Sequence, residues 1–267
     1  MVVAKTEIAD MIIYGEMQRM DIKEFFEKYP EVAIAFSGGV DSSYLLYAAK
    51  QYARRCTAYY VKSVFQPEFE LRDAKRLSDE LNVDMCIIET DVLSSDNVRK
   101  NPINRCYYCK QLIFSSIKKK ALADGYAVIL DGTNASDDAS DRPGMKALQE
   151  LEVKSPLREC GLTKDEVRRL SKEAGLFTWD KPAYACLATR IPANEPIDKE
   201  KLEKIEKAED FLFSLGYTDF RVRTMDGHAR LEVPEAQWMR VAENRDEIYG
   251  GLKDMFKSVS LSLAIRK

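Results

Sequence analysis

The most constraining feature of the sequence is a short apolar segment that stops abruptly at a pair of glycines. Residues Val32 to Phe36 form an uninterrupted apolar run, and Ser37-Gly38-Gly39 follows at once. A run of this length without polar interruption is typical of a strand buried on both faces of a sheet. Residues Asp41 to Gln51 then have the composition of a helix. The segment therefore predicts a strand, a tight polar loop and a helix in direct succession.

This strand and helix alternation continues along the first half of the chain. Alternation of this kind predicts an α/β fold with a parallel sheet and right-handed crossovers. In such sheets, ligands bind beyond the carboxyl ends of the strands. Two polar loops, Ser37–Ser43 and Asp131–Asp137, fall at those ends. Further strands are expected at 57–61, 85–88 and 127–130, and helices at 68–82 and 103–123.

The remaining segments suggest two domains. We expect an α/β domain over 1–192, with 1–30 as an N-terminal helical extension, and a small α+β domain over 197–267. The segment Ile191–Pro196 reads as the linker between them. A capping box, Thr163 with Glu166, opens a predicted helix that ends at Ala174. Other predicted elements are helices at 7–29, 198–215 and 234–248 and strands near 218–224, 229–233 and 258–265.

Composition narrows the possible partners. The chain carries 41 Lys and Arg residues against 44 Asp and Glu, a formal net charge of -3, which gives no general attraction to nucleic acid or anionic membranes. Its only histidine, His228, excludes multi-histidine metal sites. No apolar run approaches the ~18 residues of a membrane span, and charges interrupt the first 30 residues. We therefore expect a cytoplasmic protein with neither a nucleic-acid nor a membrane partner.

The loop Ser37-Gly38-Gly39-Val40-Asp41-Ser42-Ser43 has the features of a phosphate cradle. Two glycines let the backbone approach a ligand, and their N–H groups can form an anion-binding nest. The following helix directs its positive end to the same place. The loop is not a Walker A motif, because no lysine follows the glycines. The alternative interpretation is a glycine turn with a polar helix cap.

A pair of cysteines stands near the start of the predicted helix 103–123. Cys106 and Cys109 have i, i+3 spacing, which places both sulfur atoms on one helix face. In a cytoplasmic protein such a pair is more often metal-binding or redox-active than disulfide-bonded. Cys186 is the third candidate ligand. Three thiolates fit a [4Fe–4S] cluster with one open iron, and a zinc site or unligated redox thiols remain as alternatives.

Several motifs resemble those of the PP-loop pyrophosphatases. The loop matches their SGGxDS signature, which implies binding of ATP, its cleavage between the α- and β-phosphates, and a role for Asp41 in holding Mg²⁺. Gly132-Thr133-Asn134 resembles a loop that such enzymes place near the nucleotide. The segment Lys164-Asp165-Glu166-Val167-Arg168 is similar to the start of a helix that is common to these enzymes. The implied nucleotide-binding residues are Ser37, Gly38, Gly39, Asp41, Ser42, Ser43, Gly132, Thr133 and Asn134.

Over nearly its whole length the sequence resembles the LarE family. The resemblance rests on SGGVDSS, NPINRCYYCK, KPAYACLATRIP and FRVRTMDGHARLEV. It implies an ATP-dependent sulfur transferase of nickel-pincer nucleotide synthesis. Such an enzyme adenylates a carboxylate of pyridinium-3,5-biscarboxylic acid mononucleotide and replaces the adenylate with sulfur. The product is a thiocarboxylate, and family members form rings, so we expect a homo-oligomer.

The family has two sulfur sources. In one branch the cysteine matching Cys186 gives up its own sulfur, and in the other three cysteines hold a [4Fe–4S] cluster that carries an extra sulfide. Because this chain has Cys106 and Cys109 as well as Cys186, we expect the cluster branch, supplied by an external sulfide source. The sacrificial use of Cys186 remains the alternative.

The resemblance also implies roles for four charged residues. Arg190 is our candidate for stabilising phosphate or adenylate charge as a catalytic residue beside Cys186 and Asp41. Arg221 and Arg223 alternate along one strand face, and the family uses this stretch for the substrate phosphate. Glu209 matches an acidic family residue near the cleft. The alternative for each is an ordinary surface position.

Two competing functions follow from the same motifs. A tRNA thiolase shares the phosphate loop and often a three-cysteine cluster, but it needs a broad basic surface that a net charge of -3 does not favour. A non-catalytic nucleotide sensor would bind ATP without turnover. Intact Asp41, Arg190 and Lys164 favour catalysis over the sensor.

Overall fold

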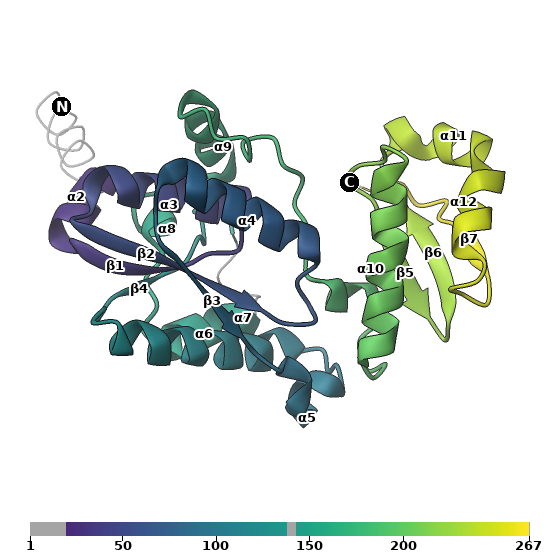
Figure 1. Ribbon diagram of the computed structural model, residues 1–267, viewed down its shortest axis with the longest axis horizontal. Coiled ribbons are helices and arrows are strands. Elements are labelled where there is room, and N and C mark those ends of the chain that lie inside the picture. The colour runs from purple at the N-terminus through teal and green to yellow at the C-terminus, as the bar shows by residue number, and fades with distance from the viewer. Residues whose placement is uncertain (1–19, 138–142, 267) are drawn as a thin grey trace, which may run out of the picture.

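A four-stranded parallel sheet forms the centre of the larger part of the molecule (Figure 1). The computed structural model describes residues 20–137 and 143–266. The strands lie in the order β3-β2-β1-β4, and every neighbouring pair is parallel. The predicted α/β fold is thereby confirmed. The strand bounds are β1 Glu31–Ala35, β2 Arg55–Lys62, β3 Met85–Glu89 and β4 Ile129–Leu130.

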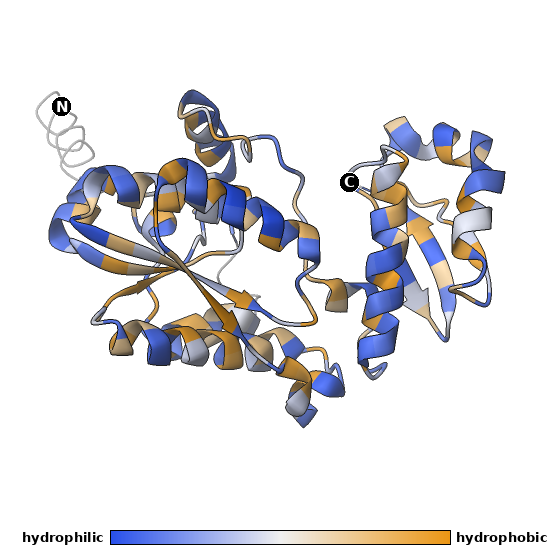
Figure 2. Ribbon diagram, viewed as in Figure 1, coloured by the Kyte–Doolittle hydropathy of each residue, from blue (hydrophilic) through white to orange (hydrophobic). Residues whose placement is uncertain are grey.

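Helices cover both faces of this sheet, and Figure 2 shows its strands as largely hydrophobic. Val32 and Ile34 of β1 pack into one apolar cluster, whereas Ala33 packs into the cluster on the opposite face. All three side chains are fully buried, which explains the uninterrupted apolar run. One face carries α2 Ile22–Lys28, α3 Val40–Tyr52, α4 Glu68–Leu81, α8 Pro156–Glu159 and α9 Lys164–Glu173, and the other carries α6 Arg105–Ala123 and α7 Pro143–Glu150 (Figure 1).

The strand order reverses beside β1. The chain runs from β1 outward to β2 and β3, and then returns to place β4 on the other side of β1. A crevice opens at such a switch point, outside the carboxyl ends of the two strands. The loop after β1 begins at Ser37, and the loop after β4 begins at Asp131. Both predicted polar loops therefore lie at this crevice.

A second, smaller sheet follows in the chain and has its own apolar core. Its order is β5-β6-β7, with an antiparallel first pair and a parallel second pair. Figure 1 shows this unit beyond the end of the larger sheet, with α10 on the side that faces it. We call these parts the α/β unit and the α+β unit. The bounds are α10 Lys199–Ser214, β5 Arg221–Met225, β6 His228–Glu232, α11 Glu235–Glu243, α12 Arg245–Leu252 and β7 Val259–Leu261.

Several predicted elements differ in extent from the observed ones. The predicted helix 7–29 is observed as α2 only, because 7–19 lies outside the described residues. The predicted helix 234–248 is two helices that meet at Asn244. The elements η1 Val92–Ser94, α5 Asp96–Arg99 and α7 were not predicted. The capping box of Thr163 and Glu166 is confirmed.

The domain limits at 192 and 197 stay a prediction. Within 20–137 and 143–266, no helix has the length and apolar character needed to cross a bilayer.

Candidate functional site

The phosphate loop joins β1 to α3 and is closed by its own serine hydroxyls. The Oγ atoms of Ser37 and Ser42 lie 3.1 Å apart. Ser42 Oγ also lies 3.2 Å from the carbonyl oxygen of Gly39, and Gly39 N–H donates to Ser37 Oγ over 3.4 Å. Ser43 is fully buried, and its Oγ has no hydrogen-bond partner in the described part of the chain. The loop is therefore held in shape without a ligand.

Two glycines at the loop are required by geometry. Gly38 has a φ of +73°, a conformation that side chains with a Cβ rarely adopt. A Cβ on Gly132 would lie 2.9 Å from the backbone nitrogen of Ser42, closer than real Cβ atoms approach. The loop after β4 thus presses its backbone directly against the start of α3.

Asp41 connects three segments that the sequence analysis singled out separately. Its Oδ2 lies 2.6 Å from Nζ of Lys164, the first residue of α9. Its Oδ1 accepts a hydrogen bond of 3.2 Å from Asn134 Nδ2. Thr133 donates to the Asp131 carboxylate, which also accepts from Ser155 Oγ at 2.6 Å. The structure therefore assembles the phosphate loop, the loop after β4 and Lys164 into one polar site.

A 260 Å³ cavity lies against this polar site. One side is formed by the two loops and the end of β2, and the other by α6. The sequence analysis did not anticipate the contribution of α6, although Lys110 stands directly after Cys109. The lining residues include Ser37, Gly39, Asp41, Ser42, Tyr60, Lys110, Ile113, Asp131, Gly132 and Thr133.

Cys106 and Cys109 at the start of α6 lie near Cys186, which directly precedes η2 Leu187–Arg190. We call these three residues the three-cysteine site. Cys106 is exposed, Cys186 is partly exposed and Cys109 is buried. Burial, together with the smaller effects of the nearby Cys186 and Cys106, raises the pKa of Cys109 to about 12. Burial also raises the pKa of Cys186. The fold therefore brings the two distant segments together.

Hydrogen bonds to the loop after β2 and to the turn between α5 and α6 hold residues 183–194, which we call the Cys186 segment. Leu187 N–H donates to the carbonyl oxygen of Phe65 over 3.0 Å. Asn101, between α5 and α6, donates from Nδ2 to the carbonyl oxygen of Pro192 at 2.7 Å. Its own carbonyl oxygen accepts from Asn194 N–H at 2.7 Å. These bonds set the position of the Cys186 segment relative to the two helix cysteines.

No group of three or more His, Cys, Asp or Glu side chains in the described residues is arranged to hold a metal ion. The three-cysteine site is thus a gathering of free thiols, and the [4Fe–4S] cluster stays a prediction.

Arg190 and Glu209 form an ion pair in which both side chains are 1% exposed. Nε and Nη2 of Arg190 donate to the two carboxylate oxygens over 2.8 and 3.0 Å. Its Nη1 donates to the carbonyl oxygen of Ala185 and to Thr189 Oγ1, both at 2.9 Å. Arg190 therefore holds the chain on both sides of Cys186, and its contact with adenylate stays a prediction.

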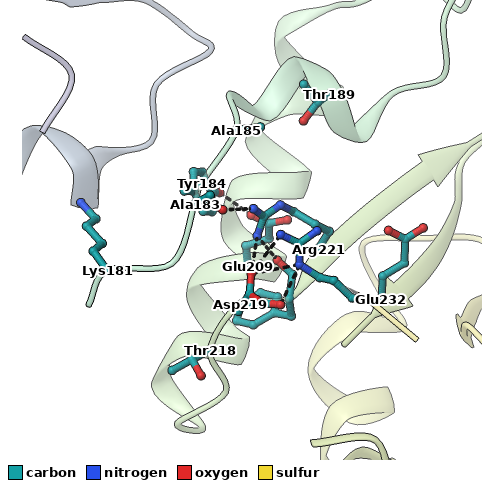
Figure 3. Close-up of polar contacts among 12 residues, drawn as sticks. Lys181, Ala183, Tyr184, Ala185, Thr189, Glu209, Thr218, Asp219, Arg221 and Glu232 are labelled. Carbon is teal, nitrogen blue, oxygen red and sulfur yellow. Dashed lines mark hydrogen bonds and ion pairs between the residues drawn. The ribbon is translucent and has the colours of Figure 1, made fainter. Parts of the chain in front are cut away.

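Glu209 is the centre of a larger network, which Figure 3 shows with Tyr184, Glu209 and Arg221 pointing toward one another. Besides Arg190, its carboxylate accepts from Val222 N–H at 2.9 Å and from the Tyr184 hydroxyl. The guanidinium of Arg221 lies 5.0 Å from the centre of the Tyr184 ring. Glu209 thus joins α10, β5 and the Cys186 segment.

Arg221 and Arg223 both extend from β5 toward the Cys186 segment. Arg221 is buried and donates to the carbonyl oxygen of Ala183, and burial lowers its pKa to about 10. Arg223 donates from Nη1 to the carbonyl oxygen of Thr189 at 2.7 Å and pairs with Glu232. Arg223 also lines a 540 Å³ cavity together with Thr189, Arg190, His228 and Arg230.

No family model matches the chain. The chain is 33% identical over 235 residues to the pyridinium-3,5-bisthiocarboxylic acid mononucleotide synthase of Lactiplantibacillus plantarum, covering 87% of this chain and 85% of that protein. It is 38% identical to an uncharacterized protein of Synechocystis over 83% of each chain. The tRNA-specific 2-thiouridylase MnmA of Pseudothermotoga lettingae is 26% identical over 57% of this chain and 54% of its own.

Proposed function

Because the chain belongs to the LarE family of ATP-using sulfur transferases, we propose that it converts a carboxylate of pyridinium-3,5-biscarboxylic acid mononucleotide into a thiocarboxylate. The family relationship supports the substrate class. The polar site beside the 260 Å³ cavity supports the use of ATP, because glycine backbone and a helix start converge there. A homo-oligomeric, cytoplasmic enzyme is part of the proposal.

The first step takes place at the phosphate loop. ATP arrives with Mg²⁺, and its phosphates contact the backbone N–H groups of Gly38 and Gly39 and the hydroxyl of Ser42. Asp41 would help to hold Mg²⁺, and Lys164, which lies 2.6 Å from Asp41 in the structure, would offer its charge to the phosphates. A carboxylate oxygen of the substrate attacks the α-phosphorus, and pyrophosphate leaves. The acyl-adenylate carries AMP as its leaving group.

The second step requires a sulfur nucleophile beside the adenylate. Cys106, Cys109 and Cys186 would hold a [4Fe–4S] cluster, which supplies a sulfide that stays nucleophilic at neutral pH. The site suits an anionic group of this kind, because three free thiols gather there and a buried nitrogen of Arg105 lacks a partner among the described residues. The Cys186 segment keeps its position through Arg190 and Glu209.

Arg221 and Arg223 would orient the mononucleotide through its phosphate. Both extend from β5 to the Cys186 segment, and Arg223 lines an open cavity. Guanidinium groups suit phosphate because their planar donors match its oxygens. The phosphate would anchor the substrate, so that its carboxylate reaches the adenylation site.

The observation that carries the proposal is that α6 contributes residues to both the nucleotide cavity and the three-cysteine site. Lys110 and Ile113 line the cavity beside the phosphate loop, and Cys109, one position before Lys110, packs in the cluster that includes Cys186. One rigid helix thus contributes to both the nucleotide site and the sulfur site. This arrangement suits adenylation and sulfur transfer on the same substrate.

The proposal is tested by measuring the two steps separately. Exchange of labelled pyrophosphate into ATP should require the pyridinium biscarboxylate mononucleotide, and thiocarboxylate should form only when sulfide and iron are also supplied. Asp41→Asn should reduce exchange by about 10²–10³-fold, whereas Asp79→Asn, an exposed aspartate on α4, should not change it. Exchange that requires tRNA instead, or ATP binding without exchange, would contradict the proposal.

A further inference from the structure

Arg105 is a buried arginine without a carboxylate partner among the described residues. It is the first residue of α6 and is 6% exposed. Its Nη1 is buried and has no hydrogen-bond partner among the residues that the structure describes. Arg190, which is 1% exposed, instead has both oxygens of Glu209 as partners. Burying a guanidinium without an anionic partner is unfavourable, so an anion bound beside Arg105 would stabilise the site.

The guanidinium of Arg105 faces the three-cysteine site. Its Nη2 lies 3.7 Å from Cys106 Sγ. Among neighbouring charges it has the largest effect on Cys186, whose pKa it lowers, and it acts in the same direction on Cys109. The positive end of the long helix α6 lies at the same place, because Arg105 and Cys106 are its first two residues. Two independent features, the guanidinium and the helix end, thus favour negative charge at the three-cysteine site.

The surroundings limit what this anion can be. Phe65 and Leu187 are fully buried beside the site, and the Phe65 ring lies 5.6 Å from the Arg105 guanidinium carbon. Against such apolar walls a multiply charged phosphate would lose far more hydration free energy than a singly charged ion, because this cost rises steeply with charge. The other polar side chains of the site that could contact the anion are the three cysteine thiols.

We propose that Arg105 is an anion-binding residue that holds the sulfide to be transferred, with Nη1 as donor to a hydrosulfide. The hydrosulfide is either free in the site or already a ligand of bound iron. The role of the bound hydrosulfide in catalysis rests on the proposed function, whereas the binding of hydrosulfide at Arg105 does not. No covalent bond to Arg105 forms or breaks, and the guanidinium keeps its protons throughout.

The test compares Arg105→Gln and Arg105→Lys with wild type and with Arg99→Gln, a matched variant of an exposed arginine on α5. In one arm, metal-free reduced protein is titrated anaerobically with sodium hydrosulfide at pH 8 in a calorimeter. In the other, iron-reconstituted protein is desalted, and acid-labile sulfide in excess of iron is counted. Circular dichroism confirms the fold of each variant.

We expect Arg105→Gln to weaken hydrosulfide binding, or to lower the excess sulfide, at least tenfold. Arg105→Lys should have an intermediate effect and Arg99→Gln none. An effect in the first arm identifies free hydrosulfide, and an effect in the second arm alone identifies iron-bound sulfide. Equal retention by wild type and Arg105→Gln, or no retention by wild type in either arm, would overturn the inference. If Arg105→Gln does not fold, Arg105→Lys with wild-type retention would also overturn it.

Failure of the proposed function has a separate signature. Pyrophosphate exchange precedes the sulfur step and should be the same in wild type and Arg105→Gln. Loss of substrate-dependent exchange in the wild type would contradict the proposed function and leave the hydrosulfide result standing. Normal exchange with Arg105-independent sulfide binding would contradict the inference alone.

Discussion

The phosphate loop and the three-cysteine site are neighbours along α6, but their polar groups are in opposite states. In the phosphate loop, Ser37, Gly39 and Ser42 bond to one another, and Asp41 is paired with Lys164. At the three-cysteine site, the thiols are free and Nη1 of Arg105 is buried without a described partner. Apart from the buried Ser43 hydroxyl, the polar groups of the first site are paired with one another, whereas a buried charged group at the second site lacks a described hydrogen-bond partner.

This difference has a physical consequence for how each site works. A loop whose backbone is already in place can bind and release ATP by exchanging only local contacts, such as the Asp41–Lys164 pair, which suits a substrate that is exchanged in every cycle. A site with unbalanced buried charge gains stability when an anion fills it, which suits a group that is retained.

Removing the Glu209 carboxylate should have the largest effect. Glu209→Ala would leave the buried charge of Arg190 unpaired and is expected to destabilise the protein by about 3–5 kcal/mol. The measurement is urea unfolding. Glu203→Gln, which removes an exposed partner of Lys199 at 3.6 Å, should change stability by less than about 0.5 kcal/mol. Equal effects of the two variants would show that the Cys186 segment does not depend on this pair.

The two helix cysteines should differ strongly in reactivity. Because burial raises the pKa of Cys109 to about 12, only about one molecule in 10⁴ has that thiolate at pH 8. Cys106 is exposed. In metal-free protein, we expect iodoacetamide to modify Cys106 at least about 100 times faster than Cys109, as read from peptide masses. The Cys109 rate should rise about tenfold for each pH unit up to pH 10, and similar rates for both cysteines would contradict the structure.

A buried carboxyl behind the phosphate loop should make stability depend on pH. Burial raises the pKa of Glu70 from 4.5 to about 7. Between these values the unfolded chain ionises at this residue while the folded chain stays protonated, so folding becomes less favourable as pH rises. Glu70→Gln should therefore match wild type at pH 4 and be more stable by about 3 kcal/mol above pH 7.

Unfolding of Glu70→Gln and of Glu80→Gln, an exposed acid on the same helix, at a series of pH values measures this difference. A constant offset between Glu70→Gln and wild type would contradict the buried carboxyl.

A methyl group at Gly132 should disturb the preformed loop more modestly. The added Cβ would lie 2.9 Å from the backbone nitrogen of Ser42, so the two loops must separate. We expect the Kd for ATP to rise by about 5–150-fold, equivalent to about 1–3 kcal/mol. Gly250→Ala, where no atom lies within 4 Å of the added methyl group, should bind ATP as wild type does. Unchanged affinity in Gly132→Ala would show that the loop is not rigid.

The contrast between the two sites also explains what the sequence could predict. The phosphate loop is a contiguous stretch whose glycines, hydroxyls and flanking apolar run mark it locally. Cys186 could be named as a third candidate ligand, but no local spacing marks its approach to Cys109, because their segments meet through tertiary packing. The same applies to Lys110, which reaches the nucleotide cavity only because α6 packs beside the sheet.

Local sequence patterns also do not reveal contacts between residues that are distant along the chain. Nothing near Arg190 in the sequence indicates that Glu209, on another helix, takes up its donors. The break at Asn244 between α11 and α12 lacks a glycine or proline to mark it. Arg105 stands beside Cys106 in the sequence, but its burial without a described partner is visible only in three dimensions.

The central claim is that the three-cysteine site delivers sulfur to an adenylate formed at the phosphate loop without being consumed. The most direct measurement is the intact mass of the anaerobically iron-reconstituted protein after reaction with ATP, sulfide and the pyridinium biscarboxylate mononucleotide, together with the thiocarboxylate formed per chain. The account predicts more than one thiocarboxylate per chain and an unchanged polypeptide mass. At most one product per chain, with loss of the elements of hydrogen sulfide at Cys186, would contradict it.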